Sequence, residues 1–185
     1  CYTRGCTGSL VMVAYGGTPT IQRKSKAPPK ETAPAAAGAQ APSYSGGGGG
    51  GCFPAGTLIE TPSGMFDIAS MSKGDWVLSF DPCGSVLRPR RILKVCQRGK
   101  HRVWEIRFAD GSRLRTTASH SLRVGGGWKR VRHLRAGDVV CCLDGASELR
   151  VRRVVCSSPT VAVEEVFNLI VEGEFTFVAD SVVAH

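Results

Sequence analysis

An internal repeat is the feature that most constrains how this chain can fold. The segment IASMSKGDWVLSFD (residues 68–81) aligns with VRHLRAGDVVCCLD (residues 131–144) at an offset of 63 residues, which places Gly74 over Gly137. The same offset aligns the apolar runs VWEIRF and VFNLIV, so turn residues and apolar positions repeat together. Two copies are too few for a solenoid. The repeat therefore predicts a duplicated unit that folds into one pseudo-twofold body.

The alternation of apolar runs and turn residues in the repeated units favours β-structure. Apolar runs of five to eight residues, rich in Val, Ile, Leu and Phe, alternate with turn signals. These turn signals are Thr61-Pro62-Ser63-Gly64, Asp81-Pro82-Cys83-Gly84, Asp110-Gly111, Gly125 to Gly127, Asp144-Gly145 and Glu172-Gly173. Asp-Gly pairs favour tight hairpins, because glycine reaches positive φ without steric penalty. We expect an all-β domain with a horseshoe-like duplicated β-unit.

The repeat and the composition together predict the domain boundaries. Residues 23–51 are dominated by Pro, Ala, Lys and finally six glycines, and such a segment cannot bury enough apolar area to offset its chain entropy. We interpret it as a disordered linker, and residues 1–22 as the remnant of an upstream region. The folded domain is expected to span residues 52–185.

The charge pattern leaves one alternative class open. The formal net charge is +9, and basic clusters occur at RPRR, WKRVRHLR and RVRR, which could contact nucleic acid. From residue 52 onward, however, 19 basic residues are interspersed with 14 acidic residues, so solvated strand faces are the favoured interpretation. No apolar run approaches the roughly 20 residues that span a bilayer. We expect neither nucleic-acid binding nor a membrane span.

Three motifs carry the chemistry. Cys52 opens the domain directly after the glycines in CFPAGTLIETPSG, Thr117 and His120 form a Thr-x-x-His, and the chain closes with FTFVADSVVAH, which ends at His185. The other cysteines form no CxxC and no zinc-like spacing. Together with the duplicated unit, these motifs strongly resemble the Hint family, the self-processing domains of Hedgehog proteins and inteins, over residues 52–185.

A cysteine thiol that follows a peptide carbonyl can attack it and convert the Gly51–Cys52 amide into a thioester. The resemblance implies that Cys52 is the nucleophile and that His120, with an ordinary pKa near 6.5, protonates the leaving amine. It implies that Thr117 holds the scissile peptide and stabilises the oxyanion, and that His185 assists. Thr117 and His120 should meet in a turn, since a strand would point them to opposite faces.

The resemblance implies cleavage or transfer of the chain's own N-terminal segment, with water, a thiol or another small nucleophile as acceptor. It departs from the intein pattern at Phe175, in place of a His, and at Asn168, in place of an Asp. Protein splicing is the alternative if an Asn and a nucleophile follow His185, and a catalytically inert basic β-module that binds nucleic acid or a protein is another. We expect a monomer without metal or organic cofactor, either secreted or cytoplasmic.

Overall fold

The fold was described in a computed structural model for residues 51–81, 86–144 and 148–185. The expected upstream remnant, and the expected linker as far as residue 50, lie outside the described residues. Within these ranges the strands are β1 (Phe53–Pro54), β2 (Leu58–Thr61), β3 (Gly64–Asp67), β4 (Trp76–Asp81), β5 (Val86–Phe108), β6 (Arg113–Thr117), β7 (Ser121–Val124), β8 (Gly127–Arg130), β9 (Val139–Leu143), β10 (Leu149–Val171), β11 (Phe177–Ala179) and β12 (Val182–Ala184). Two short 3-10 helices, η1 (Ile68–Ser70) and η2 (Val131–His133), complete the described elements.

The duplicated β-unit predicted from the sequence is confirmed. The series β2, β3, η1, β4, β5 recurs as β7, β8, η2, β9, β10, with the same spacing between corresponding elements. The strands β5 and β10 both contain 23 residues. The duplication is therefore seen both in the amino-acid sequence and in the equal lengths of the two long strands.

The hydrogen bonds around the two Gly-Asp turns repeat as well. Gly74 N–H donates to the carbonyl of Ile92 over 2.8 Å, and Gly137 N–H donates to the carbonyl of Val154 over 2.8 Å. Both glycines have positive φ, at 92° and 93°, a conformation that costs a residue with a Cβ more than it costs glycine. The glycines align because each copy needs this backbone shape.

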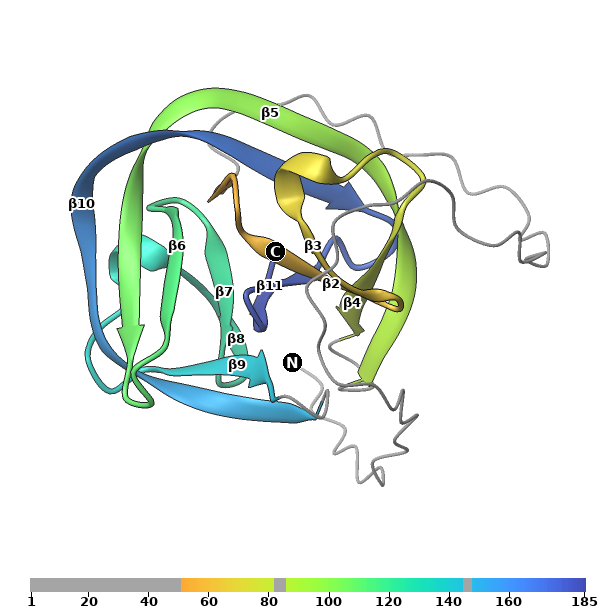
Figure 1. Ribbon diagram of the computed structural model, residues 1–185. Coiled ribbons are helices and arrows are strands. Elements are labelled where there is room, and N and C mark those ends of the chain that lie inside the picture. Colours follow the sequence, from red (N-terminus) through yellow and green to blue (C-terminus); the bar gives the residue numbers. More distant parts are fainter. Residues whose placement is uncertain (1–50, 82–85, 145–147) are drawn as a thin grey trace, which may run out of the picture.

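The two long strands form the outer wall of the molecule. β5 and β10 pair antiparallel along most of their length, and Figure 1 shows them as curved ribbons that wrap around the shorter strands β2 and β11. Register shifts interrupt their ladder at several points, as expected where a long strand pair bends strongly. The fold is all-β, as predicted.

The core lies inside this wall and draws on both copies. Its fully buried large side chains include Phe53, Phe177, Ile59, Ile106 and Leu122. The last strands, β11 and β12, pair with each other and with β2, β7 and β9, so the end of the chain enters the middle of the sheet (Figure 1). Strand β2, near the start of the domain, and strand β11, near its end, are thereby brought together.

Three of the predicted turn signals form hairpin turns in the described residues. Thr61 pairs with Gly64 across Pro62-Ser63, and Val124 pairs with Gly127. Gly111, in the turn between β5 and β6, has a positive φ of 82°. None of the described helices is long and apolar enough to cross a membrane.

Candidate active site

Cys52 lies at the point where the described chain enters the sheet. The next two residues form β1, which pairs with β10 through Phe53 opposite Phe167. Cys52 is only 3% exposed, and its preceding neighbour, Gly51, is also buried. The Gly51–Cys52 peptide bond is therefore held inside the folded domain.

Two threonines at the end of β6 hold the backbone of Cys52. The Cys52 N–H donates to Thr117 Oγ1 over 2.9 Å, and the Cys52 carbonyl accepts from Thr117 N–H over 2.9 Å. The same carbonyl accepts a 2.8 Å hydrogen bond from Thr116 Oγ1. The hydroxyl of Thr117 thus lies on the nitrogen of the Gly51–Cys52 bond. Sequence reasoning missed Thr116, although a second threonine beside Thr117 offered a signal.

His120 follows Thr117 in the predicted turn. Its N–H donates to the Thr117 carbonyl over 3.2 Å, which closes the turn. The side chain is fully buried, with ring centroids 4.3 Å from Phe53 and 6.1 Å from Phe177. Neither ring nitrogen has a well-oriented hydrogen bond within the described part of the chain. A buried imidazole of this kind has unused donor and acceptor capacity.

Gly51 packs directly against His120. A Cβ placed on Gly51 in ideal geometry would lie 2.0 Å from His120 Cα and 2.3 Å from His120 Nδ1. The Gly51 backbone also acts on the imidazole, because it raises the pKa of His120 against the larger effect of burial. The structure therefore brings Gly51, Cys52, Thr117 and His120 together around one peptide bond.

Burial suppresses charge on the side chains of both His120 and Cys52. Desolvation by burial, opposed by the Gly51 backbone and assisted by the nearby His185, lowers the pKa of His120 from 6.5 to about 3. Desolvation also raises the pKa of the Cys52 thiol to about 11, against a smaller opposing effect of Arg98. The ordinary histidine pKa expected from the sequence is thus wrong, because the ring lies in an apolar environment that disfavours its charged form. Both groups are neutral at pH 7.

His185 lies near the other site residues but at the surface. Its N–H donates to the carbonyl of Ser121 over 3.1 Å, one residue beyond His120. Its exposed ring contacts Trp128, with centroids 5.2 Å apart. Desolvation lowers the pKa of this ring as well. The structure places His185 beside the site while its ring contacts Trp128.

At the level of sequence, no protein-family model and no curated protein matches this chain. Solved structures do match. The Ssp DnaB mini-intein variant M86 has a TM-score of 0.69 at 23% identity over 74% of this chain and 93% of its own. The DnaB intein from Synechocystis sp. PCC 6803 has a TM-score of 0.67 at 24% identity, over 73% and 97%. The bacterial intein-like domain from Clostridium thermocellum has a TM-score of 0.62 at 24% identity, over 72% and 97%.

The chain has the Hint fold. At these identities the likeness concerns the arrangement of the backbone, and it covers nearly the whole length of each of these structures. The Hint fold expected from the duplicated unit and the closing motif is therefore confirmed.

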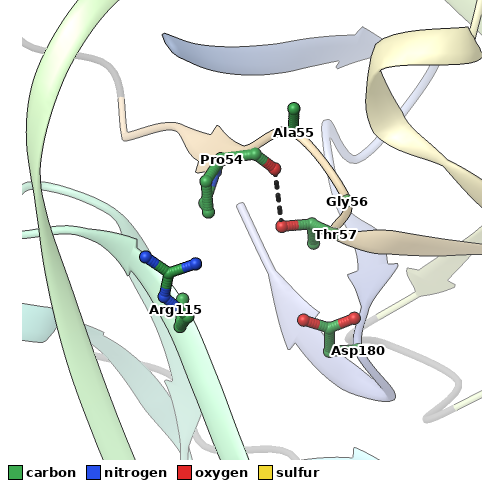
Figure 2. A pocket seen from close by; sticks show the side chains of 6 residues that line it. All are labelled: Pro54, Ala55, Gly56, Thr57, Arg115 and Asp180. Carbon is green, nitrogen blue, oxygen red and sulfur yellow. Dashed lines mark hydrogen bonds between the residues drawn. The ribbon is translucent and has the colours of Figure 1, made fainter. Parts of the chain in front are cut away.

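A small polar pocket opens beside the start of this Hint domain. It encloses about 230 Å³ and is lined by the backbone-rich segment from Pro54 to Thr57 and by the side chains of Arg115 and Asp180. Figure 2 shows the Arg115 and Asp180 side chains on opposite sides of the pocket. Asp180 Oδ1 accepts from the Leu58 N–H over 2.9 Å. Its carboxylate fastens the β11–β12 turn to β2.

The two positions that depart from the intein pattern have distinct environments. Phe175 has a positive φ of 57°, which is uncommon for a bulky side chain. Asn168 lies on β10 opposite Cys96, and its buried Oδ1 has no hydrogen-bond partner within the described ranges. No group of three or more His, Cys, Asp or Glu residues in the described parts is arranged to hold a metal ion.

Proposed function

We propose that this domain cleaves its own backbone between Gly51 and Cys52 through a thioester. The observation that carries the proposal is that Thr117 Oγ1 accepts a hydrogen bond from the nitrogen of this bond, while Gly51 packs against His120 on its other side. A nucleophile, a proton-transfer group and an orienting hydroxyl thus surround one amide, the constellation expected for acyl transfer.

The first step is an acyl shift from nitrogen to sulfur. Cys52 Sγ attacks the Gly51 carbonyl carbon and loses its proton to the neutral imidazole of His120. The resulting imidazolium gives that proton to the Cys52 nitrogen as the carbon–nitrogen bond breaks. The carbon–sulfur bond forms, the peptide bond is lost, and no net proton is taken up.

The lowered pKa of His120 favours the second of these proton transfers. An imidazole with a pKa of about 3 is neutral at pH 7 and is a weak base, which holds the thiol proton only until the amine leaves. Once protonated in an apolar pocket, it is a strong acid toward the leaving amine. The thiol, with a pKa of about 11, is rarely ionised beforehand, so the proton leaves as the attack proceeds. Thr117 orients the nitrogen and contributes to stabilising the tetrahedral intermediate.

In the second step the Gly51 acyl group is transferred from the Cys52 sulfur to a small nucleophile. With water, the Gly51 acyl group becomes a carboxylic acid and Cys52 recovers its thiol. With an added thiol, the Gly51 acyl group moves to that thiol instead. Neither step uses a metal or an organic cofactor.

The competing proposal, a basic module for nucleic acid, finds less support. Arginines of two of the three basic clusters form ion pairs with acidic neighbours, namely Arg88 with Asp81, Arg90 with Glu174, Arg150 with Asp144 and Arg152 with Asp110. Paired arginines leave less free positive charge for a phosphate backbone.

The test is to express the chain with an upstream fusion partner and to add dithiothreitol or hydroxylamine. We expect release of the partner with Gly51 at its C-terminus, identified by intact mass, and no release from Cys52→Ala. An intact fusion under these conditions, in a chain shown to be folded, would refute the proposal. Salt-sensitive binding of RNA by an uncleaved chain would favour the basic module.

A further inference from the structure

We propose that this domain cleaves only after glycine, and that the backbone of His120 imposes this restriction. The inference rests on the proposed function and adds its substrate class: polypeptides whose last residue before Cys52 has no side chain. The residue that handles the proton would then also select the substrate.

The observation is a close approach that only glycine tolerates. A Cβ on Gly51 would lie 2.0 Å from His120 Cα, 2.3 Å from its Cβ and 2.3 Å from its Nδ1, whereas real Cβ atoms essentially never come within 3.0 Å of another heavy atom. The nearest obstacle is a backbone atom. A change of rotamer at His120 therefore cannot make room, as it could at the end of a flexible side chain.

His120 is held against movement from several sides. Its N–H donates to the carbonyl of Thr117 over 3.2 Å, and its own carbonyl accepts from the N–H of Val131 over 2.9 Å. Its ring packs against Phe53 and Phe177. Displacing the His120 backbone would break these hydrogen bonds in a buried region, where unpaired backbone groups are costly.

Gly51 cannot retreat without cost either. The next residue, Cys52, is fixed through its N–H by Thr117 and through its carbonyl by Thr117 and Thr116. If a larger residue moved away from His120, the scissile nitrogen would leave Thr117. A misplacement of about 1 Å can slow an enzymatic reaction by about 100-fold.

The restriction has a chemical consequence. The thioester formed after the first step is always a glycyl thioester, whose carbonyl has no branched neighbour to hinder the second nucleophile. The described contact with His120 is made by the residue directly before Cys52. We therefore expect the requirement for glycine at this position to hold whichever upstream protein is fused to the chain.

Gly126 provides a matched control. It lies in the β7–β8 turn, and a Cβ there would meet no atom within 4 Å. In a fusion precursor treated with dithiothreitol, we expect Gly51→Ala to slow cleavage at least about 100-fold, and Gly126→Ala to cleave within about twofold of the parent. Cleavage of Gly51→Ala at the parent rate would overturn the inference.

A second measurement separates this inference from the proposed function. If the parent precursor itself is not cleaved, the proposed function fails, and the steric contact is then tested in the uncleavable Cys52→Ala chain. There, Gly51→Ala should accelerate hydrogen exchange of the amides of residue 52 and Thr117 at least about tenfold, because the hydrogen bonds between these two residues break. Gly126→Ala should not. Unchanged exchange at both amides in Gly51→Ala would refute the steric restriction.

Discussion

The amide of Cys52 donates a 2.9 Å hydrogen bond to the hydroxyl of Thr117, which lies 65 residues later in the chain. This bond joins the residue directly before β1 to the end of β6, where the turn that carries His120 begins. It also places a polar side chain on the nitrogen that must leave if the Gly51–Cys52 bond is to break.

Removing this hydroxyl should slow cleavage. In Thr117→Val the Cys52 N–H loses its acceptor while the side-chain volume is kept, and we expect a 10- to 100-fold lower rate, on the order of 1.4–2.7 kcal/mol of barrier. Thr117→Ser keeps the hydroxyl and should retain most of the rate. Single-turnover cleavage of the fusion precursor, followed by gel densitometry, gives both numbers.

Thr116 supplies the matched control for this experiment. Its hydroxyl bonds the Cys52 carbonyl, which does not belong to the scissile bond. Thr116→Val should therefore cost about 1 kcal/mol of unfolding free energy and slow cleavage much less than Thr117→Val does. Equal rate losses in the two variants would show that Thr117 acts only by holding the structure.

The stability of the domain should fall as the pH is lowered from 7 towards 3, partly because of His120. Its pKa is about 3 in the folded chain and near 6.5 when exposed. The unfolded state binds more protons than the folded state in this interval. The contribution of neutral His120 to the stability of the fold is therefore complete above pH 6.5 and is lost on acidification. The loss approaches about 1.4 kcal/mol per pH unit.

His120→Gln should remove this part of the pH dependence. Urea unfolding at several pH values, compared between the parent and His120→Gln in an uncleavable Cys52→Ala background, isolates the effect because the other titrating groups are common to both chains. Parallel stability curves for the two chains would contradict the lowered pKa. His120→Asn serves as a second neutral variant if the glutamine packs poorly.

Arg98 should assist the thiol from a distance. It lowers the pKa of Cys52 against the larger effect of burial, so Arg98→Gln is expected to raise that pKa and slow cleavage about threefold at low salt. Arg102→Gln, also exposed on β5, is the control. The difference should shrink in 1 M salt, where the Debye length is about 3 Å. A salt-independent difference would indicate a structural effect instead.

The large-scale architecture could be predicted from the sequence because the same pattern of turn residues and apolar residues occurs in both copies of the repeat. Each copy has a glycine in the turn before β4 or β9, the short strand that precedes its long outer strand, and Gly74 and Gly137 share a positive φ near 90°. Apolar runs at matching positions predicted matching strands. The motif around Cys52, Thr117 and His120 also predicted the turn in which the last two lie.

The finer features of the site could not be predicted, since they arise from contacts between distant segments. The hydroxyl of Thr116 reaches Cys52 only after β1 and β6 are brought together. The lowered pKa of His120 results from packing against Phe53 and Phe177. The approach of Gly51 to His120 likewise leaves no trace in local sequence.

The turn between β11 and β12 offers a way to stabilise the domain. Ala179 pairs with Val182 across Asp180 and Ser181, and these two turn residues have φ values of 46° and 62°. Two positive φ values characterise a type I′ hairpin turn, in which glycine is favoured at the second position. Ser181 therefore carries conformational strain that glycine would not.

Ser181→Gly should raise the unfolding free energy by about 0.5–1 kcal/mol, which corresponds to an increase in Tm of roughly 2–4 °C for a domain of this size. The loss of the 3.3 Å hydrogen bond from Ser181 to Glu60 offsets part of the gain. Ser181→Ala loses the same bond but keeps the strain, so it should be less stable than the parent. If thermal unfolding gives Ser181→Gly a Tm no higher than that of Ser181→Ala, the positive φ at residue 181 does not destabilise the domain.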